Sequence, residues 1–409
     1  PACGTKARHR REPASNSIRE EAHFLRSRFR ESLPARATYS TAAIRWQESG
    51  LATPGLRRES CGVGDSDLEY DSVILVSFGG PEERADVMPF LENVVRGKNV
   101  PPERLKEVAV HYNHFEGKSP INDQNRALIA ALEEELEKSE IDLPVYWGNR
   151  NWHPFLGDTI RQMRDDGKKR ALAFVTSAYS SYSGCRQYRE NIEAARQEVG
   201  GDAPVIDKLR VFYNHPAFIE ANVDRLLAAL ETLPKERRES ARIAFSAHSI
   251  PDAMAANCDY VAQLEETARL VAEGARHDRW QLVYQSRSGP PHVPWVGPDI
   301  LEHLDALSQI NVKDVIVAPI GFVSDHMEVV WDLDHEARDH ANELGMTLTR
   351  AETVGTHPAF VGMIRELIEE RLGRVTTRQA VGRRGPNPDV CPPDCCKYQP
   401  RVSRPPDAA

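Results

Sequence analysis

Four short apolar runs, each ending in small or polar residues, constrain the fold of this chain more than any other feature. They begin at Asp71 ("DSVILVSFGG"), Ala171 ("ALAFVTSAYSS"), Ala241 ("ARIAFSAHSIP") and Asp314 ("DVIVAPIGFVSDH"). Consecutive apolar positions are typical of strands that are buried on both faces of a parallel sheet. Helices must cover both faces of such a sheet, so the pattern predicts an α/β fold.

The segments between these runs have the spacing of amphipathic helices. One predicted apolar face is formed by Val261, Leu264, Ala268 and Val271, and Gly274 follows as a stop signal. Asn122 is expected to cap the leucine-rich helix that follows it. Strands and helices are therefore predicted to alternate along the chain.

An internal sequence similarity suggests that the chain contains two similar halves. The stretches "NHPAFIEANVDRLLAAL" from Asn214 and "THPAFVGMIRELIEERL" from Thr356 share a cap, a proline in the first turn and the same apolar spacing. Two such helices in one chain predict two similar α/β halves, each built on a parallel sheet. Ligands bind such sheets at the carboxyl ends of the strands, where the unusual polar residues of this chain gather.

The two ends of the chain differ from the part that carries the strands. Residues 1–70 contain clustered arginines without a sustained apolar period and are expected to form a disordered extension. Residues 374–409 are rich in Pro and Arg and are expected to form an irregular tail. Between them we expect the first half over 71–192 and the second over 193–373, whose last helix could pack back on the first half.

Composition excludes several classes of protein. The net charge of −9 argues against a nucleic-acid binder, which would be basic. No apolar run approaches the length that spans a bilayer. The seven cysteines are scattered and no secretory signal precedes them, so a disulfide framework is not expected. A reducing compartment, the cytoplasm, fits this usage better.

Two groups of polar residues could perform chemistry. His248 follows a predicted strand, where an imidazole can act as a base or metal ligand, although a hydrogen-bonded structural histidine would look the same. Glu328, Asp332, His335 and Glu336 would share one face of a helix. Such a file of carboxylates suits the path of a divalent cation, and the alternative is an acidic helix start favoured by the helix dipole.

Two further stretches and the terminal cysteines leave several possibilities open. The stretches "GNRNWHPF" and "QSRSGPPHVPWVGPD" suit an aromatic wall that also meets carboxylates, or a rigid loop at a domain edge. The ending "CPPDCC" places three thiols within a Pro-rich segment. From these residues alone a disulfide, a zinc site and free thiols all remain available.

Taken together, the motifs resemble those of the ferrochelatases. The stretches "SFGGPEE", "GKSPINDQNR", "NRNWHPF", "TSAYSSYSGCRQYREN", "FSAHSIP", "YQSRSGPPHVPWVGPDI" and "PIGFVSDHMEVVWDLD" lie in the order found in that family, from about Asp71 to Gly373. The resemblance implies two Rossmann-like halves with a porphyrin cleft between them, and the insertion of Fe²⁺ into a porphyrin with loss of two pyrrole protons. The motifs are most similar to those of the actinobacterial ferrochelatases, which act on coproporphyrin III.

The resemblance also implies roles for individual residues. His248 and Glu328 would bind the metal and accept protons, and Asp332 and Glu336 would assist the entry of iron. Ser119 and Tyr188 match residues that contact the porphyrin. An apolar lip over the ring would be formed by Met88, Phe90, Leu91 and Val94, although the same spacing serves a core-facing helix. Phe78 replaces a tyrosine that can ligate iron in the firmicute enzymes, so that detail does not transfer.

The resemblance implies a fourth thiol that would share a ligand with the three terminal cysteines. Some ferrochelatases bind a [2Fe–2S] cluster through one internal and three C-terminal cysteines, which here would be Cys185, Cys391, Cys395 and Cys396. Zinc bound by the same four thiolates is the alternative, and unligated thiols are a third. The cluster assignment requires the tail to fold back to the loop that carries Cys185.

The predicted function is therefore that of a ferrochelatase acting on coproporphyrin III or protoporphyrin IX. The alternatives are a porphyrin- or haem-binding protein without turnover and an iron–sulfur redox sensor. The expected partners are a porphyrin and ferrous iron, without nucleic acid and without a transmembrane segment. The apolar lip could touch a bilayer without spanning it.

Overall fold

The computed structural model describes residues 69–98, 100–289 and 292–398, which all lie within one compact unit, Val63–Ala409. Except for Glu69 and Tyr70, the extension predicted over 1–70 lies outside the described residues. In the described part of the chain, no helix is long and apolar enough to cross a membrane.

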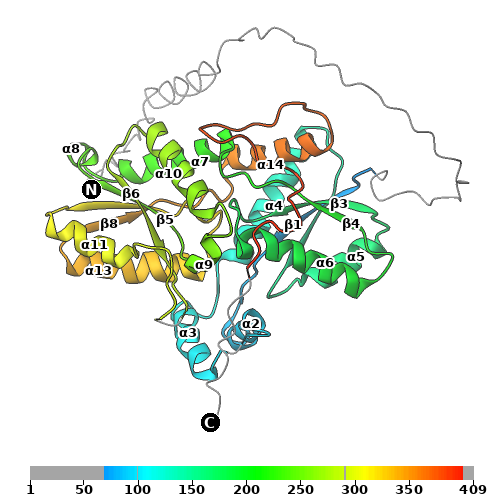
Figure 1. Ribbon diagram of the computed structural model, residues 1–409, viewed down its shortest axis with the longest axis horizontal. Coiled ribbons are helices and arrows are strands. Elements are labelled where there is room, and N and C mark those ends of the chain that lie inside the picture. The colour runs from blue at the N-terminus through cyan, green and yellow to red at the C-terminus, as the bar shows by residue number, and fades with distance from the viewer. Residues whose placement is uncertain (1–68, 99, 290–291, 399–409) are drawn as a thin grey trace, which may run out of the picture. The chain divides into compact units, whose positions relative to one another are not determined.

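The described chain forms two four-stranded sheets, each entirely parallel (Figure 1). The first has the order β2-β1-β3-β4, with β1 (Ser72–Ser77), β2 (Val145–Asn149), β3 (Arg170–Val175) and β4 (Val205–Lys208). The second has the order β6-β5-β7-β8, with β5 (Arg242–His248), β6 (Trp280–Gln285), β7 (Asp314–Ala318) and β8 (Thr347–Arg350). The prediction of a doubled α/β fold with parallel sheets is confirmed.

Helices cover both faces of the two sheets. The helices of the first sheet and its loops are α2 (Val87–Val94), α3 (Pro102–His114), α4 (Ile121–Lys138), α5 (Leu156–Asp165) and α6 (Gln187–Val199), with short η2 (Arg84–Asp86) and the π-helical turn η3 (Tyr182–Arg186). Those of the second are α7 (Pro216–Glu231), α8 (Lys235–Arg238), α9 (Asp252–Ala255), α10 (Tyr260–Gly274), α11 (Ile300–Gln309), α12 (Met327–Val329), the π-helix η4 (Val330–Ala337), α13 (Arg338–Glu343) and α14 (Pro358–Arg371). The helix predicted to stop at Gly274 is confirmed as α10.

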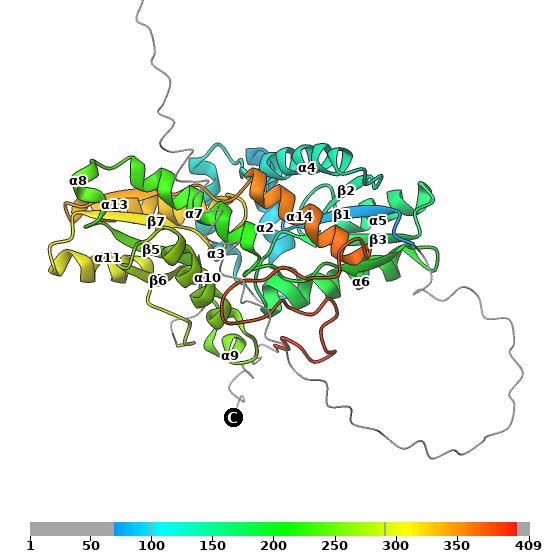
Figure 2. The same cartoon turned by 90° about the horizontal axis from the view of Figure 1, so that it is seen from above.

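One hydrophobic core runs through both halves. It joins β1 and β3 of the first sheet to β5 and β7 of the second, through residues such as Leu75, Phe174, Phe245 and Ile316. Helix α14 packs on both α7 and α4, so the last helix contacts the first half as well as the second (Figure 2). The two halves therefore share an apolar interior.

Two details of the sequence-based prediction are wrong. The boundary predicted at 192/193 falls before β4, which pairs with β3 in the first sheet through Ala171 and Ile206. The first half therefore extends at least to Lys208. Asn122 is not a cap, because α4 begins at Ile121 after Pro120. The buried Asn122 amide instead donates to the carbonyl of Gly80, at 3.0 Å, and ties α4 to the loop after β1.

The two similar stretches found in the sequence form a pair of packed helices, α7 and α14, with matched caps. His215 and His357 are the N-caps of α7 and α14, and each ring accepts a backbone N–H from the first turn. His215 Nε2 lies 3.4 Å from a Glu366 carboxylate oxygen on α14, and His357 Nε2 lies 3.3 Å from Asp224 on α7. Each helix thus supplies an acid, at the same position along its length, to the capping histidine of the other.

Candidate active site

The residues predicted to bind metal meet at the carboxyl ends of neighbouring strands. His248 is the last residue of β5, and Glu328 lies in α12, which follows β7. Because β5 and β7 are adjacent and parallel, these two ends lie side by side. His248 Nε2 is 3.5 Å from Glu328 Oε1, and His326 Nδ1 is 3.7 Å from the other carboxylate oxygen of Glu328. The structure therefore brings the predicted pair together and adds a second imidazole.

Hydrogen bonds to the backbone hold the pair in place. The Tyr260 hydroxyl donates to the His248 carbonyl at 2.9 Å, and the Gln285 amide donates to the Glu328 carbonyl at 2.8 Å. His248 Nδ1 contacts the carbonyl of Ser249. If Nδ1 carries the proton of the neutral ring and donates it to this carbonyl, the lone pair lies on Nε2, the atom that faces Glu328.

The pair is charged in the free protein. Burial disfavours the charged imidazole, but the Glu328 carboxylate outweighs it and raises the pKa of His248 to about 9. Burial also disfavours the carboxylate, but His248 outweighs it and lowers the pKa of Glu328 to about 2. At neutral pH the two side chains form an imidazolium–carboxylate ion pair, and His248 must lose its proton before it can ligate a metal.

The predicted acidic file lies on a π-helix and not on the α-helix from which its spacing was argued. Residues Val330–Ala337 form η4, which carries Asp332 and the exposed Glu336. Burial raises the pKa of Asp332 to about 7, although the Ser286 hydroxyl donates a hydrogen bond to its carboxylate. Asp332 can therefore take up or release a proton near neutral pH, close to the His248–Glu328 pair.

The residues predicted to contact porphyrin lie in the first half. Ser119 is buried, and its backbone N–H donates to the carbonyl of Pro81 in the loop after β1, at 2.9 Å. Tyr188 is buried in α6, and its ring lies under the Arg150 guanidinium, 4.6 Å from ring centroid to Cζ. Arg150 also lies over the ring of Phe78, at 5.7 Å.

Arg150 and Lys98 were not selected from the sequence as site residues. Arg150 lies in "GNRNWHPF" and directly follows β2, and its Nε donates to the Asn191 amide oxygen at 2.7 Å. Burial lowers the pKa of Lys98, and the charge of Arg150 lowers it further. Two cations that repel each other are suited to a carboxylate ligand. The arginine within the stretch "GNRNWHPF", which stands out in the sequence, was the available signal.

The predicted apolar lip is only partly a surface feature. Phe90 and Leu91 are 1% and 5% exposed. The Phe90 ring packs edge-on against Tyr112 and Trp152, at centroid distances of 5.7 and 6.3 Å. The lip prediction is therefore wrong for Phe90 and Leu91, which serve the packing of α2 on α3. Met88 and Val94 are partly exposed.

The tail folds back to the loop that carries Cys185. Arg186 Nη1 donates to the carbonyls of Pro393 and Cys395, at 2.8 and 2.9 Å. The thiol of Cys391 hydrogen-bonds Cys185, which lowers the pKa of Cys185. The thiols of Cys395 and Cys396 lie 3.4 Å apart. Among the residues that the structure describes, no three His, Cys, Asp or Glu side chains surround a single metal position.

Comparison with known proteins agrees with the motifs. A family model described as Ferrochelatase matches residues 70–372. A ferrochelatase from Rhodopirellula baltica is 56% identical, over 83% of this chain and 96% of that protein. The coproporphyrin III ferrochelatases of Streptomyces coelicolor and Nocardia farcinica are 51% and 50% identical, over 80% and 82% of this chain and 93% and 98% of their own lengths. The resemblance inferred from the motifs is confirmed, and the chain belongs to the ferrochelatase family.

Proposed function

We propose that this ferrochelatase inserts ferrous iron into coproporphyrin III rather than protoporphyrin IX. Two relatives with about 50% sequence identity to this chain are named coproporphyrin III ferrochelatases. Arg150, which lies over the rings of Tyr188 and Phe78, and Lys98, on which the charge of Arg150 acts, also support a substrate that bears more carboxylates than protoporphyrin IX does. A charge-assisted hydrogen bond between a guanidinium and a carboxylate contributes about 1.5–3 kcal/mol.

Insertion rates for the two porphyrins, measured on one purified sample, test this choice. We expect coproporphyrin III to have at least a tenfold higher kcat/KM, which corresponds to about 1.4 kcal/mol of transition-state stabilisation. Arg150→Gln should reduce this preference, whereas Arg161→Gln on the outer face of α5 should not. Equal rates, or faster turnover of protoporphyrin IX, would contradict the proposal.

The site supplies separate groups for the metal and for the protons. Glu328 keeps its negative charge at all physiological pH values and attracts the incoming cation. His248 offers Nε2 to the iron or to a pyrrole proton once its own proton has left. Asp332, with a pKa of about 7, is placed to take protons from this pair and pass them toward solvent along Glu336. Retention of iron insertion after loss of His248 would remove His248 from this role, whereas porphyrin binding without any iron insertion by the parent chain would favour the alternative of a binding protein without turnover.

The proposal includes a [2Fe–2S] cluster held by Cys185, Cys391, Cys395 and Cys396. A two-iron cluster shares four thiolates between two metal ions, whereas structural zinc gathers all four around one ion. The described thiols form two close pairs and no group of three around one position, which favours the cluster over zinc. When bound, the cluster would join the tail to the loop before α6 and could exchange an electron. Chelation changes no oxidation state, so a structural or redox-sensing role follows.

Replacing Cys395 with serine should abolish the visible absorption and the acid-labile sulfide of the purified chain. Cys258→Ser is the matched control, because Cys258 is also partly buried and its Sγ donates to the Met254 carbonyl at 3.3 Å. It should leave both signals unchanged. An unaltered spectrum in Cys395→Ser, or zinc without labile sulfide in the parent chain, would refute the cluster.

The proposal also covers the cellular compartment of the protein and its contact with membranes. We place the chain in the cytoplasm because its scattered cysteines suit a reducing compartment. We also propose that the partly exposed Met88 and Val94 contact the surface of a bilayer. Cosedimentation with lipid vesicles before and after Met88→Gln would test it.

A further inference from the structure

A basic cavity opens beside the Cys185–Cys391 pair. Its volume is about 340 Å³, and it lies between α6, β4 and the tail. Cys185 and Cys391 both line it. Its cationic lining residues are Arg189, Arg196, Lys208, Arg210 and Arg371, and its acidic ones are Glu193, Asp207 and Asp389. The cavity therefore has an excess of positive charge at the place where two of the proposed cluster ligands meet.

The acids of this cavity already have partners. Glu193 pairs with Arg196 at 3.0 Å, and Asp207 pairs with Arg170 at 2.8 Å. Asp389 pairs with Arg378. Asp207 also lies 3.5 Å from Arg371, so all three carboxylates already have cationic partners other than Lys208 and Arg189.

Two cations of the cavity lack a carboxylate. Lys208 Nζ donates to the backbone carbonyl of Leu209 at 3.0 Å, and within the described ranges neither Lys208 nor Arg189 forms an ion pair. Both cations line the cavity together with Cys185, and their charges lower the pKa of its thiol. In addition, Nη1 of the buried Arg210 has no hydrogen-bond acceptor among the described residues. Unneutralised cations and an unused donor around a thiol pair are suited to an anionic group.

A thiolate-ligated two-iron cluster is such an anion. The charges of its thiolates and sulfides exceed those of its ferric ions, and reduction adds one further electron. Nearby cations stabilise the reduced form more than the oxidised form, because the reduced form carries more negative charge. Net charge and hydrogen bonds around the sulfurs are among the factors that set the potentials of iron–sulfur clusters.

We propose that Lys208 and Arg189 are the charge partners of the cluster and raise its reduction potential. This inference rests on the cluster proposed above and goes beyond the choice of its ligands. It assigns the potential to two side chains outside the cysteine set, one at the end of β4 and one in the first turn of α6. The cavity then explains why two unpaired cations lie on the part of the first half that the tail covers.

The midpoint potential of the cluster in the full chain tests the inference. A dye-mediated spectroscopic titration should show that Lys208→Gln shifts the reduced-to-oxidised ratio about tenfold toward the oxidised form, equivalent to about 59 mV for one electron. Lys208→Arg keeps the charge and should restore most of the potential. Arg189→Gln should shift it in the same direction. Arg196→Gln is the matched control, since this cavity cation is already paired with Glu193.

The outcomes separate this inference from the cluster itself. A parent chain without labile sulfide and visible absorption would overturn both proposals. A parent chain with a cluster whose potential is unchanged in Lys208→Gln and Arg189→Gln would overturn the charge assignment alone. An equal fall in Lys208→Arg and Lys208→Gln would also overturn it, because packing rather than charge would then be responsible. An equal fall in Arg196→Gln would overturn it too, because a cation that is already paired would then act as strongly as Lys208 and Arg189. If Lys208→Gln takes up no cluster, the shift in Arg189→Gln decides.

Discussion

Replacing His248 with alanine is expected to lower the rate of iron insertion about 10²- to 10⁴-fold, the usual contribution of a positioned acid–base group. The imidazole Nε2 lies 3.5 Å from the Glu328 carboxylate, at the carboxyl end of β5. Its loss removes a proton acceptor and a metal ligand together. Porphyrin binding, measured by fluorescence quenching, should change little, because Tyr188 and Arg150 lie in the first half.

The pH dependence of the unmodified enzyme provides a second readout of the same residue. The folded-state pKa of His248 is raised from 6.5 to about 9, so most of the imidazole is protonated at pH 7. The kcat/KM for insertion should therefore rise as the pH approaches about 9, and His248→Ala should remove this step. The stabilisation that comes from the raised pKa of His248 is fully present below pH 6.5 and is lost as the pH rises through about 9. The stabilisation that comes from the lowered pKa of Glu328 is present above pH 4.5 and is lost as the pH falls through about 2.

His340→Ala is the matched control for this experiment. His340 also lies in the second half and pairs with a carboxylate, Asp305, at 2.8 Å, but it belongs to α13. Its rate and pH profile should equal those of the parent chain. Full activity of His248→Ala, with the same pH profile, would remove His248 from the proposed chemistry.

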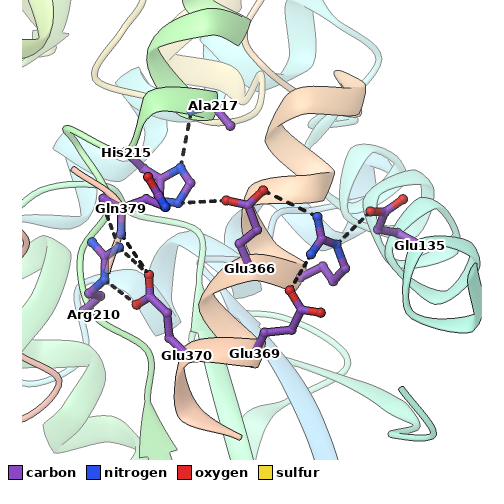
Figure 3. Close-up of polar contacts among 9 residues, drawn as sticks. Glu135, Arg210, His215, Ala217, Glu366, Glu369, Glu370 and Gln379 are labelled. Carbon is purple, nitrogen blue, oxygen red and sulfur yellow. Dashed lines mark hydrogen bonds and ion pairs between the residues drawn. The ribbon is translucent and has the colours of Figure 1, made fainter. Parts of the chain in front are cut away.

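Replacing Arg210 with alanine is expected to lower the free energy of unfolding by about 3–5 kcal/mol, the cost of leaving one member of a buried ion pair alone. Arg210 and Glu370 are 1% and 4% exposed and form two hydrogen bonds of 2.8 Å each (Figure 3). Without the guanidinium, the Glu370 carboxylate would remain buried and uncompensated. Chemical denaturation monitored by tryptophan fluorescence would measure the loss.

The same substitution should also release the tail. Arg210 Nη2 donates to the carbonyl of Gln379 at 2.9 Å, so one side chain joins the loop after β4, helix α14 and the tail. Nearby, Arg365 joins α14 to Glu135 of α4 at 3.0 Å, and Glu366 contacts His215 (Figure 3). Loss of Arg210 removes the shorter of two contacts between this network and Gln379, and limited proteolysis should then cut residues 374–398 faster.

Two variants distinguish burial of a charge from a general loss of packing. Arg210→Met combined with Glu370→Leu removes both charges and should recover much of the stability, because the buried carboxylate is no longer left unpaired. Arg374→Ala is the control for the tail, since its exposed guanidinium reaches only the carbonyls of Ser139 and Glu140, at 3.3 and 3.2 Å. A change below about 1 kcal/mol in Arg210→Ala would show that the ion pair contributes little.

The strands that the sequence revealed and those that it did not have different places in the sheets. The four predicted strands, β1, β3, β5 and β7, are the inner strands of the two sheets. They are covered on both faces, so most positions are apolar and the run is conspicuous. The edge strands, such as β4 ("VIDK") and β8 ("TLTR"), are partly exposed and contain charged residues. Their pairing depends on the neighbouring strand and leaves little mark in their own residues, which explains the misplaced boundary before β4.

The candidate site shows the same division. His248 and Glu328 could be found because His248 ends one apolar strand and Glu328 lies in the segment after another, and parallel strands place such ends together. The order of the motifs was sufficient to indicate the family. The π-helical form of η4 and the burial of Phe90 could not be derived, because apolar and acidic spacings of three and four residues are compatible with more than one helix type and with either face.

By itself the sequence determined the α/β class, the doubled architecture, the family and the residues at the inner strand ends. These features depend on neighbours along the chain, whose periodicity follows from the geometry of strands and helices. Only the tertiary structure decided that Arg210 meets Glu370, 160 residues away, and that the tail returns to the loop of Cys185. It also decided that Lys208 and Arg189 line one cavity without an ion pair to any of the described residues. Such pairings are set by the packing of α14 and the tail onto the first half, and no local pattern records which distant charge a side chain will meet.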